Sequence, residues 1–168
     1  IGNRSKGLRV ANLFAYTGGF SVYAAAGGAK RVQTIDIAPE AIEDAKENFR
    51  LNDLNPDAHG FEVCDAFRWK SQETLDLLIC DPPSLSHGKK SDQVAAHAYR
   101  DLARECGAML PKGGLLATAS CTARLSRDRW DRAVQDGLKK CGKWSSLWRS
   151  DEPPDHPVSV NHPEGRYL

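Results

Sequence analysis

Short apolar runs alternate with longer amphipathic stretches along most of this chain. Five runs have the length of buried strands and are each followed closely by a glycine, an aspartate or a cysteine. They span residues 10–15, 32–36, 61–64, 75–80 and 115–120. Between them the pattern predicts helices over 20–27, from Pro39 onward, and over 94–109 and 127–140, with a sixth strand near 144–148. Strands that alternate with helices predict an α/β fold, with a mainly parallel twisted sheet covered by helices on both faces.

Composition narrows the class of protein without naming a partner. A chain of 168 residues is the size of one domain, assigned here to residues 1–168. Its 23 basic and 22 acidic residues leave a net charge of +1, so no global field indicates nucleic acid. No apolar run approaches the ~20 residues of a membrane span. The five cysteines form no CxxC pair, which disfavours zinc and disulfides and fits a reducing cytoplasm. The missing initial methionine suggests a fragment of a longer polypeptide.

The segment Asn12–Ser21 contains the adjacent glycines Gly18 and Gly19, and an acid, Asp36, follows at the end of the second predicted strand. A glycine turn at a helix start exposes backbone N–H groups, and an acid after the next strand can bind a ribose diol. The GxGxxG spacing of dinucleotide sites is absent, and no lysine follows the turn as in a P-loop. S-adenosylmethionine fits better, with Asp36 on the ribose and Asp65 on the adenine. A purely structural corner, and a helix N-cap for Asp65, remain the alternatives.

The candidate residues share one placement. Gly18, Asp36, Asp65, Asp81 and Cys121 all fall at or just beyond the carboxyl ends of predicted strands. Ligands of open α/β sheets bind at this edge, where the strand order reverses. The shared placement therefore predicts one site.

The segment Asp81-Pro82-Pro83-Ser84 closes the fourth predicted strand. Its prolines stiffen the backbone, and Pro83 has no N–H, so the loop can direct carbonyl groups toward a flat ring. Amino-methyltransferases use a related loop that ends in an aromatic residue, for which Ser84 stands here. The structural alternative is a simple strand terminator.

Cys121 follows the fifth predicted strand and suggests a chemistry. Carbon 5 of a pyrimidine is a poor nucleophile, and a thiolate that adds to carbon 6 activates it for methylation. The alternative is a thiol packed as a small apolar side chain, the interpretation favoured for the other cysteines. Those are Cys64, Cys80, Cys106 and Cys141.

Together these motifs resemble the catalytic domain of the RlmI-type class I methyltransferases, which make 5-methylcytosine in large-subunit ribosomal RNA. The resemblance covers nearly the whole chain, and its carriers are Asn12–Ser21, Asp36, Asp81-Pro82-Pro83, Tyr99-Arg100-Asp101, Ser120-Cys121, Asp155-His156-Pro157 and Pro163–Leu168. It implies a seven-stranded sheet, here without its last strand, and N-terminal RNA-binding domains that this chain lacks.

The resemblance also assigns roles to residues. It implies Cys121 as nucleophile and Asp81 as the group that orients the cytosine. The predicted cofactor-binding residues are Phe14, Tyr16, Thr17, Gly18, Gly19, Phe20, Asp36, Ile37, Asp65, Ala66, Asp81 and Pro82. The predicted substrate-binding residues are Pro83, Ser84, Lys89 and Lys90, whereas a solvated loop is the alternative for the two lysines. No metal ligand is predicted.

The resulting prediction is an S-adenosylmethionine-dependent RNA cytosine-5 methyltransferase that releases S-adenosylhomocysteine. Its partner is RNA, of the ribosome by resemblance, and its location is the cytoplasm, with no membrane contact and with a homodimer left open. The alternatives are methylation of guanine or an exocyclic amine without covalent catalysis, and a non-catalytic cofactor- or RNA-binding module. A nicotinamide dehydrogenase is disfavoured by the glycine spacing. An arginine-rich stretch is either a solvated helix face or part of an RNA track: Arg124, Arg127, Arg129 and Arg132. The tryptophans Trp130, Trp144 and Trp148 are expected to pack within the fold and not to stack on a base.

Overall fold

The computed structural model describes residues 1–85, 92–122 and 125–150. The chain forms two compact units. The sheet unit comprises Ile1–Asp81 and Met109–Thr118, and the helical unit comprises Pro82–Ala108 and Ala119–Leu168.

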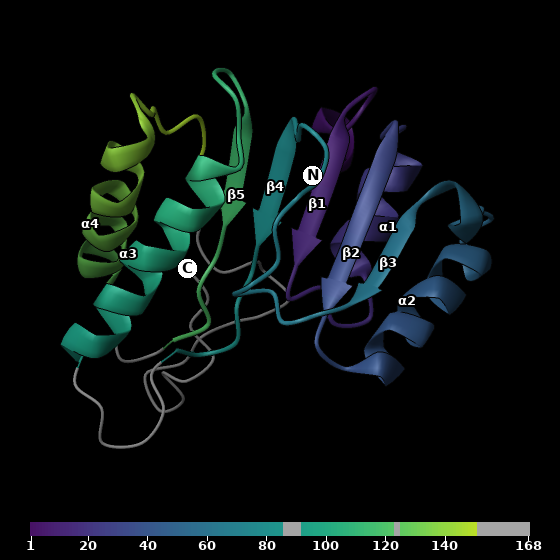
Figure 1. The fold of residues 1–168 in the computed structure, drawn as a ribbon, viewed down its shortest axis with the longest axis horizontal. Helices are drawn as coiled ribbons and strands as arrows, with labels where there is room; N and C mark the ends of the chain where they lie inside the picture. The colour runs from purple at the N-terminus through teal and green to yellow at the C-terminus, as the bar shows by residue number, and fades with distance from the viewer. Residues whose placement is uncertain (86–91, 123–124, 151–168) are drawn as a thin grey trace. The chain divides into compact units, whose positions relative to one another are not determined.

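All the strands of the described residues lie in one parallel sheet of the sheet unit. They are β1 (Arg9–Leu13), β2 (Arg31–Asp36), β3 (Gly60–Val63), β4 (Leu77–Cys80) and β5 (Leu115–Thr118). The spatial order is β3-β2-β1-β4-β5, so the order reverses between β1 and β4 (Figure 1). The parallel α/β fold is confirmed, and the five strands lie within one or two residues of most predicted bounds.

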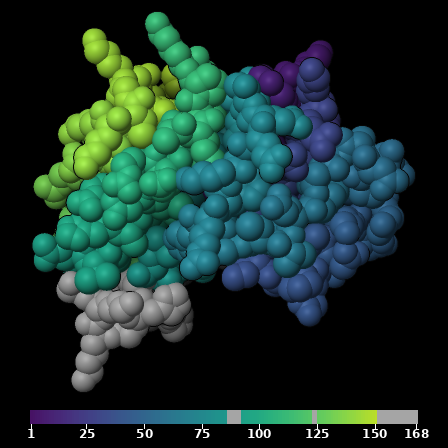
Figure 2. Space-filling model, viewed as in Figure 1, coloured from purple at the N-terminus to yellow at the C-terminus, as the bar shows by residue number. Residues whose placement is uncertain are grey.

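Two helices of the sheet unit cover one face of this sheet. They are α1 (Gly19–Ala26) and α2 (Pro39–Leu51), and Pro39 occupies the first turn as expected, because a first-turn N–H has no intrahelical acceptor. The outer side of α2 is exposed and appears in blue in Figure 2. Their inner faces bury a core with the strands, formed by Val10, Ala24, Ala25, Val32, Phe49, Leu77 and Ile79. The side chains that alternate with these on the strands are buried as well, among them Ala11, Leu13, Ile35 and Leu78.

An ion pair joins the amino ends of β1 and β4. Arg9 donates from Nε to Oδ2 of Asp76 at 3.0 Å and from Nη2 to Oδ1 at 3.2 Å. These hydrogen bonds hold the pKa of Asp76 below its ordinary value. The pair therefore fixes two central strands at the edge opposite to the predicted ligand edge.

Two long helices, α3 (Asp92–Ala108) and α4 (Arg127–Leu138), pack against each other in the helical unit. The Tyr99 and Trp130 rings meet edge to face, with centroids 6.5 Å apart, so the packing role expected for Trp130 is confirmed. Short 3-10 helices cover Gly2–Arg4 and Pro56–Ala58 in the sheet unit and Lys139–Cys141 after α4. No described helix has both the length and the apolar character needed to cross a membrane.

The predicted strand at 144–148 is wrong. Residues 143–150 have no regular secondary structure, and the side chains of Leu147 and Trp148 are 66% and 76% exposed. The apolar residues Trp144, Leu147 and Trp148 do not alternate with period two, so no single face would be buried in a strand. Packing was also expected for Trp148, and its exposure contradicts that expectation.

Candidate functional site

The carboxyl edge of the sheet collects most of the predicted cofactor residues. Phe14 directly follows β1, Asp36 ends β2, Asp65 lies two residues beyond β3, and Asp81 directly follows β4. These are the four neighbouring strands β3-β2-β1-β4, and the glycine loop and Asp81 flank the point where strand order reverses. The geometry matches the general location of ligands in open α/β sheets.

The loop between β1 and α1 has an unusual backbone. Phe14, Tyr16 and Gly18 have φ values of 58°, 48° and 78°, in the left-handed region. For a residue with a Cβ atom this conformation costs about 1–2 kcal/mol. The Tyr16 side chain is 73% exposed, so packing does not offset that cost. Strain held at a loop on a ligand edge is typical of a binding site.

The Asp36 carboxylate holds this loop. Its Oδ2 accepts the Tyr16 N–H at 2.8 Å, and its Oδ1 accepts the Ala38 N–H at 3.0 Å. Each carboxylate oxygen has a second lone pair, so both oxygens can still accept a hydroxyl of a ligand. Next to Asp36, the Ile37 side chain is 69% exposed and offers an apolar surface at the same edge.

The two glycines of the loop differ in what they do for the fold. Gly18 is buried, and a Cβ there would lie 2.7 Å from the Ala45 Cβ of α2. Gly19 begins α1, has no left-handed φ, and a Cβ there would meet nothing within 4 Å. The fold therefore requires Gly18, whereas the open space at Gly19 leaves the N–H groups at the helix start accessible.

Buried and half-buried polar side chains support the loop, a role that the sequence did not reveal. Asn12 donates from Nδ2 to Ser21 Oγ at 3.0 Å, and Thr34 donates to the same oxygen at 2.9 Å. Asn48 of α2 donates from Nδ2 to the Thr17 carbonyl at 2.8 Å. Among the described residues, Asn12 Oδ1 is buried without a partner. A buried acceptor without a hydrogen bond lowers the stability of the fold, so its presence beside this loop requires an explanation.

Asp65 begins a tight turn after β3. Its Oδ1 accepts the Phe67 N–H at 3.0 Å, so it caps a single turn and not the helix considered as an alternative. The adjacent Ala66 is buried. Phe67 is 48% exposed, and its ring meets that of Phe14 edge to face at 5.0 Å. Phe67 was not predicted to be a site residue, although the sequence shows an aromatic residue two positions after Asp65.

The segment after β4 crosses from one unit to the other. Asp81 is half-buried and belongs to the sheet unit. In the helical unit, Pro82 is buried, Pro83 is exposed and Ser84 is half-buried. Lys89 and Lys90, the other predicted substrate contacts, lie outside the described residues.

Within the helical unit, the Cys121 thiol meets the loop after β4. Its Sγ lies 3.9 Å from the Pro82 carbonyl oxygen, which accepts the S–H. The preceding residue, Ser120, is fully buried and donates its hydroxyl to the Tyr99 hydroxyl of α3 at 2.8 Å. Tyr99 was noted in the sequence, but not this contact, which anchors the segment that carries Cys121.

Cys121 differs from the most buried cysteines. Cys80 and Cys106 are 2% and 1% exposed and pack as small apolar side chains, as predicted. Cys121 is half-buried, and so are Cys64 and Cys141, for which full burial was expected. None of the five cysteines, all of which lie in the described residues, forms a disulfide. Among the described residues no group of three or more His, Cys, Asp or Glu side chains could hold a metal ion.

The amino-acid sequence of this chain is similar to those of known methyltransferases. Residues 1–159 match the model of a family described as S-adenosylmethionine-dependent methyltransferase. The chain is 38% identical over 170 residues to a ribosomal RNA large subunit methyltransferase of Deinococcus radiodurans, a match that covers 98% of this chain and 41% of that protein. It is 35% identical to the ribosomal RNA large subunit methyltransferase I of Tolumonas auensis, covering 99% of this chain and 44% of that protein.

Solved structures of methyltransferases have a similar fold. A protein described as a methyltransferase complexed with SAH superposes with a TM-score of 0.82 at 28% identity, over 99% of this chain and 45% of that one. A SAM-dependent methyltransferase from Streptococcus mutans gives a TM-score of 0.83 at 27% identity, over 98% of this chain and 44% of that one. The chain thus spans less than half the length of these relatives.

Proposed function

The chain belongs to the family of S-adenosylmethionine-dependent methyltransferases, and from this membership we propose that it methylates carbon 5 of a cytosine in ribosomal RNA with Cys121 as nucleophile. The observation that carries the proposal is the half-buried Cys121 thiol at the Pro82 carbonyl, on a segment anchored by Ser120 and Tyr99. The names of the similar proteins support ribosomal RNA as substrate. The cofactor, S-adenosylmethionine, follows from the family itself.

The residues at the carboxyl edge of the sheet fit this cofactor. Asp36 keeps free lone pairs for the ribose hydroxyls, and the accessible backbone at Gly19 suits a polar ligand tail. The exposed side chains of Ile37 and Phe67 offer apolar surface for an adenine, beside the Asp65 turn. When bound, S-adenosylmethionine supplies an electrophilic methyl group.

Cys121 would activate the acceptor carbon. Its thiolate adds to carbon 6 of the cytosine, which forms a sulfur–carbon bond and makes carbon 5 nucleophilic. After methylation the proton on carbon 5 is removed, the sulfur–carbon bond breaks, and the thiolate is released as the ring regains its double bond. Asp81 would orient the base through its ring nitrogen or amine. The target base must leave its stack for the thiol to reach the ring, which suits single-stranded or loop RNA.

A second candidate function is methylation of guanine or an exocyclic amine. The Asp81-Pro82-Pro83-Ser84 segment favours it, because such loops accept hydrogen bonds from an amine. In that reaction Cys121 has no chemical role. A non-catalytic cofactor-binding module is the third outcome. A cytoplasmic location and a homodimer stay predictions.

Methylation of unmodified ribosomal RNA distinguishes these functions. The protein is incubated with tritiated S-adenosylmethionine and large-subunit RNA that lacks modifications, and the digested nucleosides are identified by mass spectrometry. We expect label in 5-methylcytidine. Label in a methylated guanosine or in an N-methylated base would support the second candidate, and cofactor binding without transfer would support the module.

The cofactor assignment predicts a large effect at Asp36. We expect Asp36→Asn to weaken S-adenosylhomocysteine binding by about 10- to 100-fold, measured by calorimetry. The NH₂ group of the asparagine replaces one carboxylate oxygen and cannot accept the N–H of Tyr16 or Ala38. The substitution also removes the negative charge that strengthens hydrogen bonds from the ribose hydroxyls. The matched control is Asp44→Asn on the exposed side of α2, which should bind as the wild type does. Equal affinity of the Asp36 variant and the wild type would contradict the assignment.

A further inference from the structure

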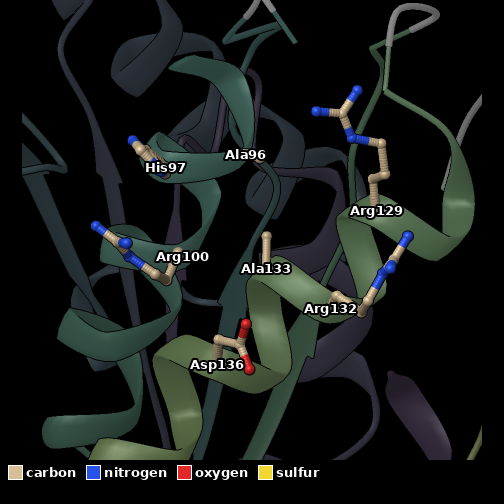
Figure 3. A pocket seen from close by; sticks show the side chains of 7 residues that line it. All are labelled: Ala96, His97, Arg100, Arg129, Arg132, Ala133 and Asp136. Atoms are coloured by element: carbon tan, nitrogen blue, oxygen red, sulfur yellow. The ribbon is translucent and has the colours of Figure 1, made fainter. Parts of the chain in front are cut away.

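A hollow of about 300 Å³ lies between α3 and α4 of the helical unit. Figure 3 shows Ala96 and Ala133 at its centre, with longer side chains around them. His97 and Arg100 come from α3, and Arg129, Arg132 and Asp136 come from α4. The volume is at the lower end of small-ligand sites and matches a small hydrated group.

Basic groups predominate around this hollow. The lining contains three arginines, one histidine and a single acid, Asp136. Lys139 donates to Asp136 at 2.8 Å and is the main cause of a lowered Asp136 pKa, to which the charges of Arg100 and Arg132 add. Arg100 of α3 and Arg132 of α4 thus both act on the Asp136 carboxylate, although they belong to different helices. Arg100 also pairs with Asp101 at 3.1 Å and Arg129 with Asp92 at 2.9 Å, so Arg132 is the lining arginine without a paired carboxylate among the described residues.

Two of the arginines, Arg132 and Arg129, are available to an anion. Arg132 donates from Nε to the Asp128 carbonyl at 3.1 Å, and no carboxylate within the described part of the chain forms an ion pair with it. Arg129 pairs with Asp92 at 2.9 Å, and its side chain is 43% exposed. Exposed pairs of this kind contribute about 0–1 kcal/mol, so exchanging the carboxylate for another anion costs little.

The chemistry of the lining favours phosphate. A guanidinium group binds a phosphate with two parallel hydrogen bonds. Arginine can anchor a protein interface too, but the lining holds no Trp or Tyr and no large apolar side chain that could fill a pocket on a protein partner. Electrostatic contact with a charged backbone therefore fits this hollow better than contact with a folded protein.

We propose that the hollow between α3 and α4 binds a backbone phosphate of the substrate RNA, through residues other than those predicted to hold the cofactor. This inference rests on the proposed function, because it takes RNA as the substrate. Such a contact fixes the position of the RNA on the helical unit and carries no sequence information.

The test is the salt dependence of RNA binding. Arg132→Gln and Arg129→Gln are compared with the wild type, using a single-stranded segment of large-subunit RNA over a series of potassium chloride concentrations. For each lost phosphate contact, we expect the slope of log affinity against log salt to become shallower by about 0.7. Arg50→Gln is the matched control, since Arg50 is an exposed helix arginine of the sheet unit paired with Glu47. It should leave the slope unchanged.

The outcomes separate the two proposals. If the wild type methylates RNA and both pocket variants keep its slope, the phosphate site is wrong and the proposed function stands. If poly-glutamate competes with RNA for the wild type as well as an equally charged RNA does, an acidic protein partner replaces RNA at this hollow. If the wild type neither binds nor methylates RNA while it binds S-adenosylhomocysteine, the proposed function fails, and the phosphate site fails with it.

Discussion

Replacement of Cys121 by alanine is expected to lower methyl transfer to RNA by about 10³-fold or more, the scale seen when other enzymes lose their nucleophile. Without the thiolate, carbon 5 of cytosine stays a poor nucleophile even with cofactor and RNA bound. Binding of S-adenosylhomocysteine should not change, because Cys121 is not one of the predicted cofactor residues. Transfer is measured with tritiated cofactor, and binding by calorimetry.

The control for this variant is Cys141→Ala. Cys141 lies in the same unit, is also half-buried and likewise donates its S–H to a backbone carbonyl, that of Arg104 at 3.2 Å. It should keep wild-type transfer. RNA that contains 5-fluorocytosine adds a direct test, since fluorine at carbon 5 blocks the elimination step and should trap a covalent adduct in the wild type and in Cys141→Ala but not in Cys121→Ala. Full activity of Cys121→Ala, or an adduct that persists in it, would rule out Cys121 as nucleophile.

The strand and helix pattern was readable from the sequence because each element carries its own period. Parallel strands buried on both faces appear as continuous apolar runs, and α2 shows Ile42, Ala45 and Phe49 on one face. The exception was 144–148, where apolar residues without a period suggested a strand that does not form. Apolar composition alone does not specify an element when alternation is missing.

Site residues that act through local chain position were also readable. Asp36 and Asp81 lie at strand ends, and their placement follows from the parallel topology. Residues that act through distant partners were not. Asn48 lies 31 positions from the Thr17 carbonyl that it binds, and Ser120 lies 21 positions from Tyr99. Such contacts depend on helix packing, which a linear pattern does not encode.

The different roles of the two adjacent glycines could not be predicted from the sequence, in which Gly18 and Gly19 form one motif. The structure separates them by the space around each Cβ position and by backbone conformation. The separation leads to opposite expectations for two single substitutions. One should lower stability, and the other should lower cofactor affinity.

Gly18→Ala is expected to lower the free energy of unfolding by about 2–5 kcal/mol, the sum of a left-handed alanine and an overpacked contact. The new Cβ would lie 2.7 Å from that of Ala45, so α2 must shift from the loop that it supports. Denaturant unfolding followed by circular dichroism measures the change. An unfolding free energy equal to that of the wild type would show that the loop can relax without moving α2.

Gly19→Ala should leave stability within about 0.5 kcal/mol, as an exposed substitution without contacts does. At the same time we expect it to weaken S-adenosylhomocysteine binding by about tenfold or more, because a methyl group at the start of α1 keeps the ligand from the backbone N–H groups. Each variant is thus the control for the other: Gly18 is required by the fold and Gly19 by the ligand. Wild-type affinity in Gly19→Ala would mean that the cofactor does not approach the helix start, and the open space at Gly19 would then need another explanation.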